Sequence, residues 1–143
     1  MTESLYIEQF NLTGKTAIVT GGGGILGRRF CSGLAQFGAN VVVADLHYDA
    51  AIKLATDLEY RYGSRALAVS CDVADQDSVQ KMVDYVVSEL GEINILHNNA
   101  AGKSKNLDAF FAPFEEYSLE QWREIMSVNL DGMFLVAQAV GKQ

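Results

Sequence analysis

The fold is indicated most clearly by one glycine-rich stretch, Lys15-Thr-Ala-Ile-Val-Thr-Gly-Gly-Gly-Gly-Ile-Leu-Gly27. Its first six residues form a short apolar run that suits a buried strand, and an amphipathic helical pattern begins directly after Gly27. Glycines let the backbone turn sharply and let a pyrophosphate approach without a Cβ in the way, while the helix that follows offers unpaired N–H groups. Strand, glycine loop and helix in this order predict a dinucleotide-binding unit. A glycine-rich turn that serves only packing is the alternative.

Three further apolar runs resemble the first, at residues 40–45, 65–70 and 93–98. Helical stripes of apolar residues separate them, and Asp75 and Ser118 (with Gln121, as in a capping box) are expected N-caps. Four alternations of strand and helix predict an α/β fold with a doubly wound, Rossmann-like parallel sheet. We expect residues 1–143 to form one dinucleotide-binding domain. The stripes are Leu26, Phe30, Leu34 and Phe37; Ala51, Leu54, Ala55, Leu58 and Tyr62; Val79, Met82, Val83, Val86, Val87 and Leu90; and Trp122, Ile125, Met126, Leu130, Phe134, Ala137 and Val140.

The composition excludes several classes of protein. The net charge of -7 argues against a nucleic-acid partner, because phosphate binding needs clustered Lys and Arg. Cys31 and Cys71 lie in no Cys-x-x-Cys or Cys/His motif, so we expect reduced structural thiols, no metal site and a cytoplasmic protein. The first eleven residues do not resemble a signal peptide, and no apolar run reaches the roughly 18 residues of a membrane span.

Asp45 ends the second apolar run, 18 residues after Gly27 (45 − 27). A dinucleotide fold places there the carboxylate that accepts hydrogen bonds from the adenosine ribose, and this carboxylate repels a 2′-phosphate. The glycine loop holds no cation before Gly27, and Arg28 and Arg29 are expected to be solvated or structural. The sequence therefore favours NAD over NADP. The alternative roles for Asp45 are a helix cap or an ordinary surface acid.

Three more motifs follow in order: Cys71-Asp72-Val73, Asn98-Asn99-Ala100 and Val128-Asn129-Leu130. With the glycine loop, they resemble the short-chain dehydrogenase/reductase family from about Leu12 to Gly141. The resemblance implies an oxidoreductase that binds a nicotinamide dinucleotide and a small-molecule substrate, and that forms a homodimer or homotetramer when full length.

The resemblance also implies a role for each matching residue. Asp45 would hold the adenosine ribose, Asp72 the adenine amino group, and Asn98 would tie the sheet together. Asn129 would support the proton relay of the active site, although a buried Asn bonded to backbone would also suit its place on an apolar stripe. The implied cofactor-binding residues are Gly21, Gly24, Ile25, Leu26, Gly27, Asp45, Leu46, Asp72, Val73, Asn99 and Ala100.

The chain departs from the family pattern at three places. Ile25 stands where the usual loop has glycine, so the spacing is T-G-x-x-G-x-x-G, and Ala101 replaces the usual glycine of N-N-A-G. The stretch 102–117 is longer than expected. It carries Phe110, Phe111 and Phe114, which suit a substrate lid, an interface or local packing.

The catalytic residues of the family are missing from this chain. The family uses a serine and a Tyr-x-x-x-Lys pair, and no tyrosine here has lysine four residues on. In addition, residues 93–98 suit a central strand, yet no later strand is predicted to pair with them. We therefore expect the N-terminal portion of a longer NAD-dependent oxidoreductase that acts on an alcohol or ketone of a polar, sugar-like molecule. The alternative is a non-catalytic dinucleotide sensor or an interaction module.

Overall fold

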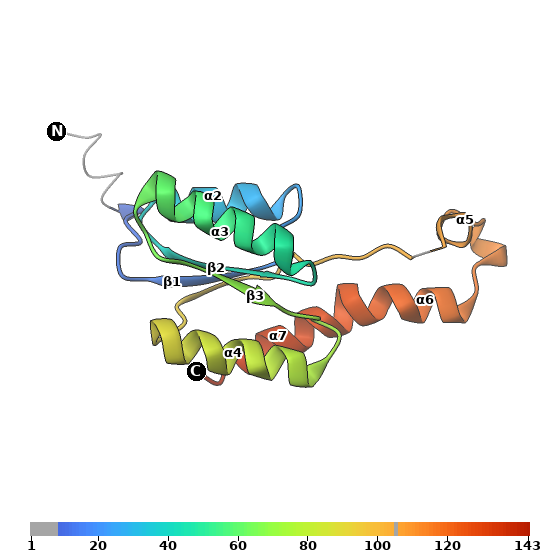
Figure 1. Cartoon of the computed structure of the whole chain (residues 1–143). Coiled ribbons are helices and arrows are strands. Elements are labelled where there is room, and N and C mark those ends of the chain that lie inside the picture. Colours follow the sequence, from blue (N-terminus) through green and yellow to red (C-terminus); the bar gives the residue numbers. More distant parts are fainter. Residues whose placement is uncertain (1–8, 105) are drawn as a thin grey trace.

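The computed structural model describes residues 9–104 and 106–143, which form a parallel sheet between two layers of helices (Figure 1). All pairings are parallel and the strand order is β3-β2-β1-β4. The predicted α/β architecture with a Rossmann-like sheet is confirmed. The strands are β1 (Thr16–Thr20), β2 (Asn40–Asp45), β3 (Ala66–Ser70) and β4 (Ile95–His97).

Helices follow each strand. Helices α2 and α3 cover one face of the sheet and α4 and α7 the other, whereas α5 and α6 extend beyond its end (Figure 1). In the described part of the chain, no helix combines the length and the apolar character that crossing a membrane requires. The helices are α2 (Gly27–Gln36), α3 (Tyr48–Tyr62), α4 (Gln76–Leu90), α5 (Leu107–Phe110), α6 (Leu119–Met126) and α7 (Gly132–Val140), with a 3₁₀ turn η1 (Phe114–Glu116) and a π-helical turn η2 (Ser127–Asp131).

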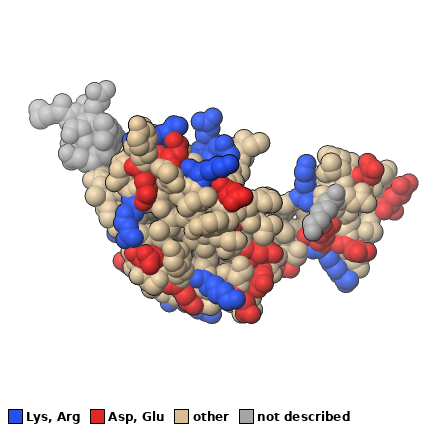
Figure 2. Space-filling view, in the orientation of Figure 1, with Lys and Arg blue, Asp and Glu red and all other residues tan. Residues whose placement is uncertain are grey.

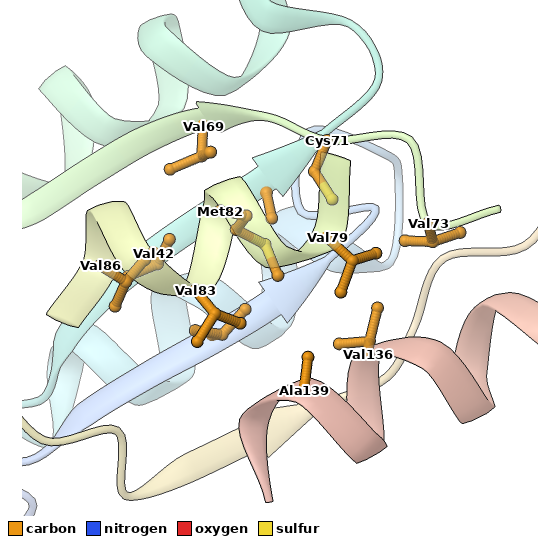
Figure 3. Packing of buried hydrophobic residues seen from close by; sticks show 12 residues of the cluster. Val42, Val69, Cys71, Val73, Val79, Met82, Val83, Val86, Val136 and Ala139 are labelled. Carbon is orange, nitrogen blue, oxygen red and sulfur yellow. The ribbon is translucent and has the colours of Figure 1, made fainter. Parts of the chain in front are cut away.

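The core consists of two apolar clusters, one on each face of the sheet. Because side chains alternate along a strand, β2 supplies Val41 and Val43 to the cluster under α2 and α3, and Val42 to the cluster under α4 and α7. Figure 3 shows this second cluster, in which Met82 of α4 and Val136 of α7 are fully buried. A sheet that is apolar on both faces explains why its strands are continuous apolar runs.

The strand order contains one reversal. The chain builds β1, β2 and β3 outward in one direction and then returns to place β4 on the other side of β1. In open α/β sheets, ligands bind at the carboxyl ends of the strands where such a reversal occurs. The segments after β1 and β4 therefore meet where a ligand site is expected.

Both predicted N-caps are confirmed. The Asp75 carboxylate accepts the N–H groups of Asp77 and Ser78 at the start of α4, and the Ser118 hydroxyl accepts that of Gln121 in α6. Only half of the capping box is seen among the described residues: the Gln121 side-chain oxygen does not accept the Ser118 N–H, and the Gln121 NH2 group donates to Glu124 Oε2.

The stripe predicted for α2 is wrong. Leu26, Phe30 and Phe37 are exposed, Leu34 is only half-buried, and the buried residues of the helix are Gly27, Cys31 and Ala35. Small side chains occupy the buried face because α2 lies very close to the glycine loop, where a larger group has no room. Phe30 instead lies against the His97 ring at the end of β4, with ring centroids 4.2 Å apart.

The apolar stripe predicted for residues 122–140 is also wrong, again because small residues occupy the buried face. The single helix expected after Ser118 is two helices joined by the π-helical turn, and Trp122, Leu130, Phe134 and Ala137 are exposed. Of the predicted stripe only Ile125 is buried, with Met126 and Val140 half-buried. The buried residues of α7 are Gly132, Val136 and Ala139. A Cβ on Gly132 would lie 2.8 Å from Val73 Cγ2, so close packing selects the face with small residues.

The stripes of α3 and α4 agree better with the structure. Ala51, Ala55 and Leu58 are buried in α3, where Leu54 is half-buried and Tyr62 exposed. In α4, Val79, Met82, Val83 and Val86 are buried, and Val87 and Leu90 pack against the same cluster.

Strand β4 has the edge position that the sequence predicts when no later strand pairs with it, although its apolar residues suit a central strand. Within the described residues it lies at the edge of the sheet and pairs only with β1, and its three residues are half-buried. The strand is also shorter than the predicted run, since the preceding Asn94 side chain accepts the Thr16 N–H outside the ladder.

The change Asp75→Ala removes the acceptor for two N–H groups at the start of α4. We expect the free energy of unfolding to fall by about 1 kcal/mol, measured by urea unfolding. The control is Asp75→Asn, which keeps a side-chain oxygen and should lose much less. Equal losses for the two variants would contradict the capping role.

Candidate dinucleotide-binding cleft

A cleft of about 850 Å³ opens at the carboxyl ends of the strands. Its volume is typical of a small-molecule site. The residues that line it come from the glycine loop, the end of β2, the segments after β3 and β4, and α6. The structure brings all of the predicted cofactor-binding residues to this cleft: Gly21, Gly24, Ile25, Leu26, Gly27, Asp45, Leu46, Asp72, Val73, Asn99 and Ala100.

The glycine loop needs glycine at two positions in particular. Gly21 has φ of 63°, and a Cβ there would lie 2.9 Å from Ala100 Cα. A Cβ on Gly27 would lie only 2.1 Å from the carbonyl oxygen of Gly21. The loop therefore closes on itself and on the segment after β4 without room for a side chain.

Helix α2 begins at the cleft with no side chain bonded to its first N–H groups. A helix N-terminus of this kind suits an anion such as a pyrophosphate. The guanidinium of Arg28 donates to the carbonyl oxygens of Gly23 and Gly24, so it holds the loop, which agrees with the structural role expected from the sequence. The backbone N–H groups of Arg28 and Arg29 bond to the carbonyl oxygens of Gly24 and Leu26, so the helix contributes its dipole and the N–H groups before them. The cleft beside the glycine loop and this helix start together fit a dinucleotide.

Asp45 is buried at the end of β2, and both of its carboxylate oxygens are used. Oδ2 accepts the Gly23 N–H at 2.9 Å, and Oδ1 accepts the His47 N–H at 2.9 Å. The carboxylate therefore joins the glycine loop to the start of α3 and lines the cleft between them. Within the described residues neither predicted alternative fits Asp45, because it is buried and because no side chain caps α3 at its N-cap residue, His47.

The segment after β4 is bonded to the end of β1. The Thr20 hydroxyl, fully buried, accepts the N–H groups of Asn99 and Ala100, both at 3.0 Å. The Asn99 amide donates to the carbonyl oxygens of Thr20 and Gly21. Asn99 thus makes the link between strands that the sequence analysis assigned to Asn98, whose amide donates instead to Met133 O in α7.

The segment after β3 forms the opposite wall. Asp72 is exposed and its carboxylate accepts the Ala74 N–H at 3.0 Å, while Val73 is buried against Gly132. Ile25, Leu26 and Leu46 line the cleft with exposed fractions of 85%, 65% and 62%. Exposed apolar side chains at the mouth of a polar cleft are suited to cover a flat ring or a ribose.

Asn129 lies half-buried in the π-helical turn, and its side-chain amide bonds to both peptide groups that flank the Cα of Gly102. Its Oδ1 accepts the Gly102 N–H at 2.7 Å and its Nδ2 donates to the Gly102 carbonyl oxygen at 3.1 Å. This backbone bonding is the alternative that the sequence left open for Asn129. The bonds also hold Gly102, which lines the cleft. π-Helical turns recur at functional sites.

Several residues that build the cleft were not predicted from the sequence. Thr20 and Gly23 hold the glycine loop, and Lys103 and Glu124 line the wall that follows β4. Thr20 stands in the T-G of the loop motif and could have been found there. Nothing in the sequence singles out Gly23 among four glycines, or Lys103 and Glu124, because their places depend on how residues 102–104 run beside α6.

The described residues contain no group of three His, Cys, Asp or Glu side chains that could hold a metal ion. Charged side chains of both signs are interspersed over the face that Figure 2 shows, without a continuous basic patch. Of the charged residues at the cleft, Asp45, Asp72 and Glu124 are acidic and Lys103 is basic.

Comparison with known proteins establishes the family. The sequence profile described as short chain dehydrogenase matches residues 15–143, so this chain belongs to the short-chain dehydrogenase family. The chain is 41% identical over 134 residues to D-threitol dehydrogenase from Mycolicibacterium smegmatis, and 35% identical over 133 residues to gluconate 5-dehydrogenase from Gluconobacter oxydans. These matches cover 94% and 93% of this chain and 49% of each relative.

Solved structures agree with the sequence relatives. The NAD⁺-bound xylitol dehydrogenase superimposes with a TM-score of 0.84 at 31% identity, over 92% of this chain and 48% of that one. The chain thus spans about half the length of these relatives.

Gly27→Ala tests the closed shape of the loop. The added Cβ would meet the Gly21 carbonyl oxygen and the backbone of Gly22. We expect dinucleotide affinity, measured by calorimetry, to fall at least about tenfold (roughly 1.4 kcal/mol). The control is Gly33→Ala in the same helix, where a Cβ meets nothing within 4 Å; it should bind normally and gain up to about 1 kcal/mol of stability. Normal binding by Gly27→Ala would contradict the close approach.

The two cysteines are buried and free. Burial raises the pKa of the Cys31 thiol from 9.0 to about 12. Burial likewise raises the pKa of Cys71 to about 11, although its hydrogen bond with Ser78 acts in the opposite direction. The thiolate is the reactive form, so both side chains should behave as inert core residues at neutral pH.

These pKa values predict a loss of stability in alkali. From pH 9 toward about 11 the unfolded chain releases thiol protons that the folded chain keeps, so the free energy of unfolding falls as the pH rises. Below pH 9 this contribution is fully present. At pH 8, iodoacetamide should modify both thiols quickly in urea and slowly in the folded protein. Fast modification of the folded protein would show that the thiols are open to solvent.

Proposed function

We propose that this chain is the dinucleotide-binding part of an NAD-dependent oxidoreductase. When bound, the nicotinamide cofactor supplies a hydride acceptor or donor for an alcohol or ketone carbon. The observation that carries the proposal is the buried Asp45 carboxylate, which lines the cleft beside the glycine loop and the open N-terminus of α2.

We assign the following roles to residues that line the cleft. The glycines 21, 24 and 27 and the first N–H groups of α2 bind the pyrophosphate, and Asp45 accepts hydrogen bonds from the adenosine ribose. Asp72 faces the adenine amino group, with Val73 and Leu46 beside the rings. Asn99 and Ala100 line the opposite end of the cofactor with Ile25 and Leu26, and Asn129 supports the reaction centre by fixing Gly102. We infer a single domain over residues 1–143.

The substrate class is a polar small molecule with several hydroxyl groups. Relatives of this chain are named for D-threitol, gluconate and 5-keto-D-gluconate, and a similar structure is that of a xylitol dehydrogenase. Both neutral polyols and sugar acids occur among these names.

Calorimetry on the full-length protein with NAD and NADP tests the cofactor preference. Two like charges about 4 Å apart repel by up to about 4 kcal/mol at an effective dielectric of about 20, and less at a solvated site. We therefore expect NAD to bind at least about tenfold more tightly than NADP, which corresponds to roughly 1.4 kcal/mol. Tighter binding of NADP would overturn the proposed role of Asp45.

Asp45→Asn removes the charge together with one of the two acceptor oxygens. A changed loop should weaken the binding of both dinucleotides, so the ratio of NADP to NAD dissociation constants reports the charge and should fall about tenfold or more. The matched control is Asp49→Asn on α3, which makes the same change of charge outside the cleft lining and should leave the ratio unchanged. Binding of NAD without turnover of any alcohol or ketone would favour a dinucleotide sensor over an enzyme.

A further inference from the structure

We propose that Lys103 is a specificity-determining residue that binds the carboxylate of a polyhydroxy-acid substrate. The inference rests on the proposed function, because it names which of the polar substrates the cleft prefers. The first observation is the distribution of charged side chains in the lining of the cleft. Among the described side chains that line the cleft, Lys103 is the one lysine, and none is an arginine.

The backbone of Lys103 is fixed on both sides. The Asn129 amide bonds to both the N–H and the carbonyl oxygen of Gly102. On the other side, the Ser104 hydroxyl is buried and donates to Glu124 Oε2 at 2.8 Å, and it accepts the Asn106 N–H at 3.0 Å. A lysine on a surface loop is usually free to move with its backbone, whereas this one extends from a segment bonded to the helical layer at both neighbours.

Glu124 of α6 anchors the segment after Lys103, because it accepts the Ser104 hydroxyl. Its Oε2 also accepts the Gln121 amide at 2.9 Å, and Gln121 is buried. Two donors on one oxygen disperse the negative charge of this carboxylate, which lowers its repulsion of an anion nearby. Glu124 therefore serves as a positioning residue for the wall that carries Lys103.

Among the residues that the structure describes, no carboxylate forms an ion pair with the ammonium of Lys103. The ion pairs of the described residues join Arg61 to Asp57 and Arg65 to Glu89, both away from the cleft. Lys103 thus presents an unpaired charge to a cleft whose other charged side chains are acidic. A carboxylate ligand is repelled beside Asp45 and Asp72 and attracted at Lys103, which orients the molecule as well as selecting it.

The chemistry favours a carboxylate over the cofactor's pyrophosphate. The start of α2, which no side chain caps, already favours the pyrophosphate on the glycine side of the cleft through the helix dipole. Lys103 follows Asn99 and Ala100 on the wall formed after β4, where a substrate would meet the reacting end of the cofactor. A single ammonium is a point charge that matches one carboxylate.

The test uses the full-length protein with NAD and matched pairs of acid and polyol: threonate and threitol, xylonate and xylitol, gluconate and glucitol. We expect kcat/KM to be higher for an acid than for its polyol. Lys103→Gln should raise KM for the acid at least tenfold, with kcat changed less than twofold and the polyol unaffected. Lys103→Arg should restore most of the loss, and Lys81→Gln on α4 is the control for charge alone.

The outcomes separate this inference from the function on which it rests. Turnover of polyols in preference to acids, or an equal effect of Lys103→Gln on both, overturns the role of Lys103 and leaves the oxidoreductase intact. A weaker affinity of Lys103→Gln for NAD, measured by calorimetry without substrate, also overturns it, because the lysine then contacts the cofactor. Turnover of neither class in the presence of bound NAD contradicts the proposed function itself.

Discussion

The approach of two backbone segments at the carboxyl edge of the sheet governs the structure. The loop after β1 and the segment after β4 come so close that a single Cβ on Gly21 would lie 2.9 Å from Ala100 Cα. The Thr20 hydroxyl and the Asn99 amide hold this contact with four hydrogen bonds between them. Thr20 is buried and the other residues of this contact are half-buried at the base of the cleft, so losing one of the bonds would leave a polar group poorly satisfied there. The cleft lies between these two segments, beyond the point where they are bonded to each other.

Small residues have the same importance in the helical layers. Gly27, Cys31 and Ala35 of α2 and Gly132, Val136 and Ala139 of α7 allow the helices to lie close to the loop and to Val73. The large apolar side chains of these helices are then left on the outer faces. Close packing depends on the shape of side chains as well as on their hydrophobicity. Where a helix lies against backbone, only small side chains fit between them.

This preference explains which parts could be predicted from the sequence. The strands, the order of elements and the caps at Asp75 and Ser118 depend on local patterns, and they were predicted well. The buried faces of α2 and α7 were not, because a search for large apolar residues at helical spacing finds the face with Phe30 or Phe134. The motif residues of the cleft were found through their order along the chain. Lys103 and Glu124 were missed, since only the path of residues 102–104 beside α6 brings them to the cleft.

Asp45 has two roles in the cleft, so few substitutions at this position would preserve both. One oxygen of its carboxylate fixes the glycine loop through Gly23 and the other fixes the start of α3 through His47. A mutation at this position therefore alters the shape of the loop together with the charge beside it. An evolutionary path toward a ligand with a different charge would need a second substitution that supplies a new acceptor for the Gly23 N–H, and the two changes would have to be acquired together or in a tolerated order.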